Sequence, residues 1–151
     1  MAVAAHVGKV SKDYSPYGFS IMADSIVSHT AQVTAASTVI PVLYADDVDL
    51  YIESGRFTVG VVATTSAGHH FGWRLATYNA STGAATGDVL QSAVPQPSAL
   101  TVNVFVDLGV NQKQVVAKGN FLALVPNDAD GAGTNADVSD ITCAIRYRRK
   151  A

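Results

Sequence analysis

The sequence predicts an all-β protein: an antiparallel, jelly-roll-like β-sandwich of about nine or ten short strands. Apolar and polar residues alternate with the period of two that is typical of half-buried strands. Clusters of Gly, Ser, Asn and Asp separate these stretches, as turns do. No longer stretch repeats its apolar positions with the helical period of about 3.6 residues. The length of 151 residues predicts a single domain.

The first 18 residues show neither period, and we expect an extended N-terminal arm that lies on a neighbouring subunit. The alternative is a first edge strand of the same domain. Residues 19–151 then form the β-sandwich domain. Residues 19–28 are predicted as one strand or a broken pair. In the β-branched stretch 32–42, Pro41 indicates an edge or a strand end, because proline has no N–H to donate to a neighbouring strand.

Residues 48–53 and 56–64 alternate cleanly and are predicted as two strands. Ser54-Gly55 between them is typical of a turn, so we expect a hairpin. Before this pair, Asp46-Asp47 is predicted to be a turn.

The second half of the chain begins with a predicted strand over residues 71–78. Its side chains Phe71, Trp73, Leu75 and Thr77 share one face. A polar loop follows over 79–87. The remaining predicted strands cover residues 88–92, 100–107, 114–117, 120–125 and 138–147. A turn at Lys118-Gly119 and a Gly/Asp-rich loop over 127–137 separate the later ones.

Composition excludes several classes of partner. The chain is 48% apolar and only 15% charged, against about 25% charged in a typical soluble domain. Such low charge favours an oligomer or a docked subunit. A net charge of −2 provides no field to attract nucleic acid. We expect no membrane insertion, because no apolar run approaches about 18 residues, and the N-terminus lacks the features of a secretion signal.

Charged residues gather in two places. Four of the ten basic residues are Arg146, Arg148, Arg149 and Lys150. They indicate either a solvated basic tail or an electrostatic contact with an acidic neighbour. Nucleic-acid binding is disfavoured, because no series of aromatic residues accompanies them. The densest acidic patch covers residues 46–53 and indicates a solvated face or a docking site for a basic partner.

Catalysis requires convergent ionisable groups, and the sequence offers few. Adjacent His69 and His70 point to opposite faces of a strand, so they cannot hold one metal from one chain. Copies of one histidine on an oligomer axis are the alternative. The loop 127–137 contains Asp-x-Asp-Gly but lacks the Glu and the helices of an EF-hand, which leaves adventitious Ca²⁺ as the alternative to a plain loop. Cys143 lies in an alternating run and is predicted to be a small buried hydrophobe. We therefore predict no enzyme, no cofactor and no metal site.

Three stretches resemble the jelly-roll domains of tailed-bacteriophage structural proteins, which include tail-fibre tips, head fibres and capsid decoration proteins. Residues 73–83, WRLATYNASTG, resemble that group's strand ending in Tyr-Asn-x-x-x-Gly. Residues 86–90, TGDVL, are similar to the return into the next strand, with Thr86 where the group usually has proline. Residues 118–124, KGNFLAL, resemble the closing strand, with Phe121 where Trp or Tyr is usual. The resemblance covers about a third of the chain.

The resemblance implies a capsid decoration (cement) protein, because the chain has no repetitive shaft of the kind that fibres carry. It implies the major capsid protein as the partner and a homotrimer as the assembly. The protein would be made in the host cytoplasm and act on the capsid surface of the virion. The alternative is a receptor-binding or fibre-head module of a phage tail or head fibre.

Each role has its candidate residues. The capsid contacts would come from the arm and the basic end: Val3, Val7, Val10, Tyr14, Tyr17, Arg146, Arg148, Arg149 and Lys150. The receptor contacts would come from the two polar loops: Asn79, Ser81, Thr82, Asp128 and Asp130.

Overall fold

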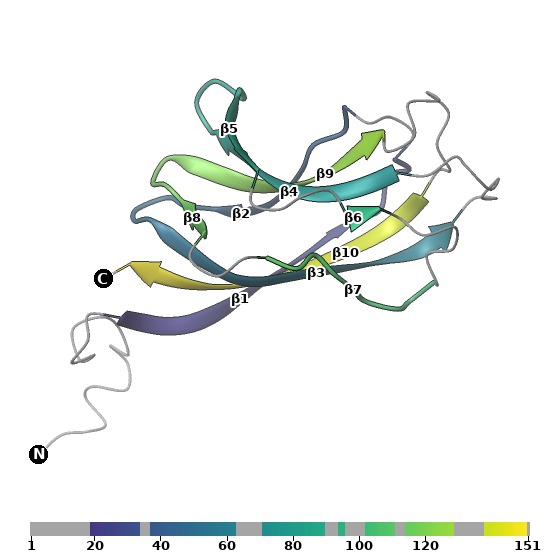
Figure 1. Ribbon diagram of the computed structural model, residues 1–151, viewed down its shortest axis with the longest axis horizontal. Helices are drawn as coiled ribbons and strands as arrows, with labels where there is room; N and C mark the ends of the chain where they lie inside the picture. The colour runs from purple at the N-terminus through teal and green to yellow at the C-terminus, as the bar shows by residue number, and fades with distance from the viewer. Residues whose placement is uncertain are drawn as a thin grey trace, which may run out of the picture.

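The computed structural model of the chain consists of two antiparallel β-sheets packed face to face (Figure 1). It describes residues 19–33, 37–62, 71–89, 94–95, 102–110, 114–128 and 138–150. The predicted N-terminal arm, His69 and His70, and residues 129–137 of the Gly/Asp-rich loop lie outside the described residues. The strands are β1 (Phe19–His29), β2 (Ile40–Tyr44), β3 (Leu50–Val62), β4 (Phe71–Asn79), β5 (Ala85–Val89), β6 (Val94–Pro95), β7 (Val106–Asp107), β8 (Gln114–Val116), β9 (Asn120–Asp128) and β10 (Val138–Lys150).

The strand order is that of a jelly roll. The first sheet runs β1-β10-β3-β7, and β8 also pairs with β3. The second sheet runs β2-β9-β4-β5, and β6 also pairs with β4. Because β7 and β8 share one partner, and β5 and β6 share another, each of these pairs takes the place of one interrupted strand. With each of these pairs counted as one strand, β1 pairs with β10, β2 with β9, β3 with β7/β8, and β4 with β5/β6. This is the pairing of a jelly roll. The predicted fold class is confirmed.

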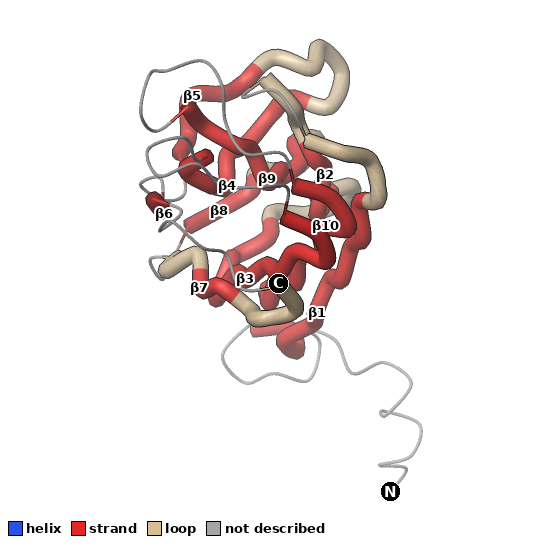
Figure 2. Tube along the Cα trace, turned by 90° about the vertical axis from the view of Figure 1, so that its right-hand side faces the viewer, coloured by secondary structure: helices blue, strands red, loops and turns tan. Residues whose placement is uncertain are grey.

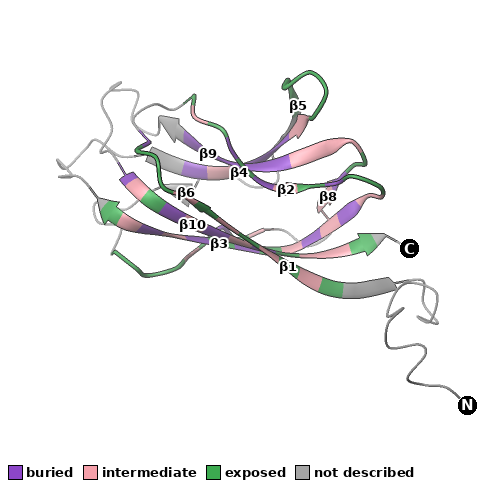
Figure 3. Cartoon of the chain, turned by 180° about the vertical axis from the view of Figure 1, so that it is seen from behind, coloured by how far each residue is buried: buried purple, intermediate pink, exposed green. Residues whose placement is uncertain are grey.

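The core lies between the sheets and is made by the alternate residues that point inward (Figure 3). Trp73 and Leu75 on β4 are fully buried, and Thr77 is 1% exposed, which confirms the predicted inward face. Phe57 on β3 meets Trp73 from the opposite sheet, with ring centroids 5.2 Å apart. These two rings therefore join the sheets at the centre of the sandwich.

Thr77 is a buried polar residue, and its hydroxyl is hydrogen-bonded to that of Thr86 on β5. The Thr86 hydroxyl in turn donates to the Thr77 carbonyl at 3.2 Å. A buried hydroxyl without a partner would destabilise the fold. Thr86 thus has a structural role that the proline usual in the phage group could not fill.

The predicted hairpin at Ser54-Gly55 is wrong, because β3 is one continuous strand paired with β10 along most of its length. Arg146 faces Ser54, but the next residue, Tyr147, faces Ile52. Glu53 is therefore an extra residue, which defines a β-bulge. The bulge shifts the buried positions from Leu50 and Ile52 to Phe57 and Val59.

Gly55, which the sequence suggested as part of a turn, is instead explained by packing, because the core leaves little room for a side chain there. A Cβ added there would lie 2.9 Å from Leu75 Cδ1 and 3.1 Å from Ile145 Cδ1. The glycine lets the backbone of β3 approach the core side chains closely. A Ser-Gly pair can thus indicate a turn or a bulge, and here it is a bulge.

A second irregularity joins Gly60 on β3 to Asp140 on β10. Asp140 has a φ of 53°, in the left-handed region that side chains rarely adopt. A Cβ added to Gly60 would lie 2.7 Å from the Asp140 Cβ. The two residues therefore fit together only because one of them is glycine.

Gly60→Ala is expected to lower the free energy of unfolding by about 1–3 kcal/mol, because the Asp140 Cβ is fixed by the backbone and cannot rotate away. In an Asp140→Gly background the clashing Cβ is gone, so the same substitution should cost less than half as much. Urea unfolding of the two single variants and the double variant measures this coupling. Equal costs in both backgrounds would contradict the steric explanation.

Other strands also differ from expectation at their ends. The predicted polar loop 79–87 ends earlier, because β5 begins at Ala85 rather than at residue 88. The predicted strand 100–107 is reduced to β7, because Asn103 turns the chain with a φ of 62°. The last strand continues to Lys150 rather than ending at Tyr147, and β9 extends to Asp128. By contrast, Pro41 lies on the edge strand β2, as its missing N–H predicted.

Candidate interaction face

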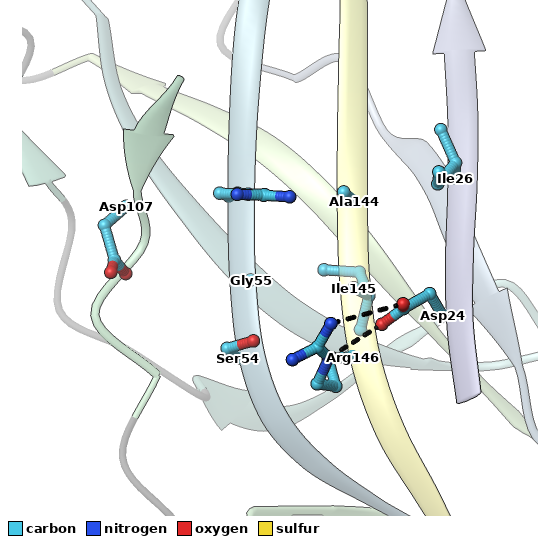
Figure 4. A pocket seen from close by; sticks show the side chains of 9 residues that line it. Asp24, Ile26, Ser54, Gly55, Asp107, Ala144, Ile145 and Arg146 are labelled. Carbon is cyan, nitrogen blue, oxygen red and sulfur yellow. Dashed lines mark hydrogen bonds and ion pairs between the residues drawn. The ribbon is translucent and has the colours of Figure 1, made fainter. Parts of the chain in front are cut away.

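Side chains from four strands form the outer face of the first sheet, the side turned away from the core. Ile26, Ala144, Arg56 and Asp107 stand directly opposite one another across β1, β10, β3 and β7. Directly opposed residues in a sheet point to the same side. Figure 4 shows Ile26, Ala144 and Asp107 of this row and, next to them, Asp24 and Arg146. We call this surface the outer face.

A depression of about 230 Å³ lies in the outer face. Small residues, Ser54, Gly55 and Ala144, are among those that line it. Its other lining residues are Asp24, Ile26, Arg56, Asp107, Ile145 and Arg146. The surface is therefore shallow and bordered by charges of both signs, which suits a contact with another surface better than a small-molecule cavity.

The predicted basic tail is instead the end of β10, and its arginines pair with acidic residues of the same chain. Arg146 Nε donates to Asp24 Oδ1 at 2.9 Å, and a second nitrogen donates to Oδ2 at 3.4 Å (Figure 4). Arg148 Nε lies 2.8 Å from Glu53 Oε1. These residues are therefore part of a strand rather than a tail.

The acidic patch, residues 46–53, also pairs with an arginine of β10. Arg149 binds both carboxylate oxygens of Asp47. Asp49 Oδ1 accepts a hydrogen bond from the Lys118 backbone N–H at 2.9 Å. Residues 46–53 are thus bound to β10 and to the turn before β9. The side chain of Lys150 is not described.

The ion pairs predict acid titration behaviour. Hydrogen bonding from Arg146 holds the pKa of Asp24 below its ordinary value, and Arg149 lowers the pKa of Asp47 in the same way. A lowered folded-state pKa stabilises the fold above the unfolded-state pKa, and that stabilisation is lost as pH falls through the folded value. Both pairs should therefore weaken only below about pH 4.

Carboxyl NMR titration tests this assignment residue by residue. Arg146→Gln should raise the pKa of Asp24 toward 3.8 and leave that of Asp47 unchanged. Arg149→Gln should do the reverse. If either substitution moves both carboxyl groups equally, the pairing is not local and the assignment fails.

Apolar side chains are exposed mainly on and beside the outer face. Of the eight large apolar residues that are exposed in the described part of the chain, six belong to the first sheet or to the segment that runs along β3. They are Met22, Ile26, Val61, Val102, Val104 and Phe105. The segment is held to β3 by a hydrogen bond from Asn103 N–H to the Val59 carbonyl. Phe105 also packs under the Arg56 guanidinium, 4.8 Å from its ring centroid.

The loop after β4 is held together by hydrogen bonds between its own residues. Asn79 Oδ1 accepts hydrogen bonds from the backbone N–H groups of Ser81 and Thr82, at 2.9 and 3.1 Å, and from the Ser81 hydroxyl at 2.6 Å. Of these candidate receptor residues, Ser81 and Thr82 are exposed and Asn79 is half-buried, with its side-chain oxygen already bonded within the turn. Asp128 ends β9 with a side chain that is not described, and Asp130 lies outside the described residues.

A row of aromatic residues, which the sequence reasoning missed, crosses the outer side of the second sheet. Tyr44, Phe121 and Tyr78 stand opposite one another on β2, β9 and β4. The Tyr78 and Phe121 rings stack at 5.3 Å. Tyr44 also borders a second depression of about 280 Å³, lined in addition by Asp46, Asp47, Leu50, Tyr147 and Arg149. The three strands are distant in sequence, so only their pairing reveals the row.

The described residues show no obvious site for metal chemistry. They contain no group of three or more His, Cys, Asp or Glu residues placed to hold an ion. Cys143 is buried, and burial raises the pKa of its thiol to about 12. The prediction of a small buried hydrophobe is confirmed. Within the same described ranges, no helix has the length and apolar character needed to cross a membrane.

Comparison with known proteins gives limited results. No family model and no curated protein match the chain. Two similar solved structures are viral capsid assemblies. The structure of the T13 IBDV viral particle has 10% sequence identity and a TM-score of 0.34, covering 85% of this chain and 36% of that one. The infectious bursal disease virus VP2 subviral particle has 13% identity and a TM-score of 0.30, covering 87% and 38%. This chain therefore spans just over a third of the length of each, and TM-scores this low do not bear on function.

Proposed function

We propose that the protein is a structural component of a virus particle: a decoration protein that binds the outer surface of a bacteriophage head as an oligomer and stabilises the shell. The observation that carries the proposal is the concentration of exposed apolar side chains on and beside one face of a jelly-roll body. Exposed apolar patches on a protein surface are typical of contact sites for other proteins. The sequence resemblance supplies the kind of partner, the major capsid protein.

The ion pairs support a role in assembly rather than in chemistry. Arg146 and Arg148 are engaged with Asp24 and Glu53, so the charges at the border of the outer face are largely balanced. A partner can then cover the apolar residues without burying an unpaired charge, which would be costly. Arg56, held over Phe105, supplies the kind of arginine and aromatic contact that is enriched in interfaces. We assign the chain no catalytic activity.

The proposed stabilisation follows from mass action. A protein that binds the expanded shell, and does not bind the disassembled subunits, stabilises the shell by RT ln(1 + c/Kd) per site, where c is its free concentration. No conformational change in the decoration protein is needed. The N-terminal arm and the β10 arginines are proposed as additional contacts around the apolar residues.

Co-sedimentation with empty expanded shells and with intact host cells tests the proposal. We expect the purified protein to sediment with shells and not with cells. Val61→Glu, on the outer face, should weaken shell binding at least tenfold, because it places a charge in an apolar contact. Val39→Glu is the matched control, since Val39 is similarly exposed but precedes β2 of the other sheet. Binding to cells and not to shells would reject the proposal.

A receptor-binding module is the second candidate, and the aromatic row favours it. Tyr44 and Tyr147 border a depression that also contains Asp46 and Arg149. Aromatic rings beside hydrogen-bonding groups suit a ligand with both apolar and hydroxyl surfaces, such as a saccharide. In the same assay, this role predicts cell binding that Tyr44→Ala removes.

A further inference from the structure

In the described part of the chain the two sheets have four edges, and three of them are short or interrupted. β2 has only five residues, contains Pro41 and shifts register beside it. The edge opposite β2 is divided between β5 and β6, and the edge of the first sheet beyond β3 is divided between β7 and β8. Short strands, prolines and irregularities are the usual means by which proteins prevent edges from pairing with other chains.

β1 is the exception. It has 11 residues, contains neither proline nor lysine, and lies at the border of the first sheet (Figure 2). Its register with β10 is regular from Met22 to His29. In the described part of the chain its other side pairs with no strand. An edge of this length and regularity offers backbone donors and acceptors to a further strand.

Two exposed apolar side chains of β1, Met22 and Ile26, lie on the outer face. Ile26 is 70% exposed, the highest value among the exposed large apolar residues of the described ranges, and Met22 is 47% exposed. The carboxylate between them, Asp24, is paired with Arg146. The edge can therefore approach an identical edge without bringing unpaired like charges together.

We propose that β1 pairs antiparallel with β1 of a second copy about a two-fold axis at Ile26, which joins the first sheets of two copies into one continuous sheet. Such an interface uses the same surface twice and closes on itself. The proposal replaces the homotrimer that the sequence resemblance implies by a dimer, and it concerns the purified chain alone rather than the role at the capsid.

Side-chain chemistry selects the register. With the axis at Ile26, the two isoleucines face each other, and each Asp24 faces Ser28 of the second copy, whose hydroxyl can donate to it. An axis at Asp24 would place two carboxylates opposite each other, and an axis at Ser25 would place Asp24 opposite an isoleucine. Both arrangements are less favourable.

A charge-swap experiment tests both the partner and the register. Light scattering after gel filtration should give the wild-type chain a mass twice that of one chain. Ile26→Lys and Ile26→Glu should each raise the dimer dissociation constant about 100-fold or more, because apolar contacts are lost and like charges face each other. An equimolar mixture of the two variants should again be dimeric, because Lys then faces Glu.

Val61→Lys and Val61→Glu are the matched controls, since Val61 is an exposed apolar residue of the same sheet but lies on β3. Both should remain dimeric. A monomeric wild-type chain would overturn the proposal, and so would a trimer, which requires a different interface. A dimer that survives Ile26→Lys, or a mixture that stays monomeric, would equally overturn it. Circular dichroism identifies any variant that has lost the fold, in which case Ile26→Thr replaces the charged variants and should still weaken the dimer.

Discussion

Trp73→Ala is expected to lower the free energy of unfolding by about 3–5 kcal/mol, the usual range for truncating a large buried aromatic side chain. Trp73 has no exposed surface, and its ring meets that of Phe57 from the opposite sheet. The substitution therefore removes the contact that joins the two sheets at the centre of the core. The jelly roll has little freedom to close such a cavity, because Trp73 lies on β4, which pairs with β9 throughout.

Tyr44→Ala is the control, since Tyr44 is 53% exposed on the edge strand β2. Its effect on stability should stay within about 0.5 kcal/mol. Denaturant unfolding of both variants, followed by tryptophan fluorescence for Tyr44→Ala and by circular dichroism for both, gives the comparison. A loss below about 1 kcal/mol for Trp73→Ala would mean that the inward face of β4 is assigned wrongly.

Deleting residues 1–18 is expected to abolish attachment to capsid shells and to leave the domain folded. Within the described ranges, all buried residues of the main core lie between Val33 and Ile145, so the deletion removes none of these. The arm contains Val3, Val7, Val10, Tyr14 and Tyr17, which is more apolar than a free solvated terminus requires.

The measurement combines co-sedimentation with shells and thermal unfolding of the free protein. The unfolding temperature should be nearly unchanged, and the mass should remain that of the wild-type assembly, because β1 is intact. Retained attachment would remove the arm from the set of contacts and leave the outer face as the binding surface.

The fold class was predictable because it depends on local alternation, which each strand carries in its own sequence. The inward face of β4, the turn at Lys118-Gly119 and the burial of Cys143 all follow from positions a few residues apart. The β3 hairpin was predicted wrongly for the same reason. A bulge and a turn use the same residue types, and only the partner strand decides between them.

The candidate site was less predictable, because its contacts join distant parts of the chain. Arg146 and Asp24 are 122 residues apart, and Arg149 and Asp47 are 102 apart. The sequence shows a basic cluster and an acidic patch, but not that strand pairing brings them together. The aromatic row of Tyr44, Phe121 and Tyr78 depends in the same way on the order of β2, β9 and β4.

The number of copies in washed, purified virus particles tests the proposed function most directly. A decoration protein repeats with the symmetry of the shell, so we expect hundreds of copies per particle, in a fixed ratio to the major capsid protein. Quantitative mass spectrometry of whole particles provides both counts. About a dozen copies, the number typical of a fibre at a few symmetry positions, would contradict the decoration role and favour the receptor-binding module.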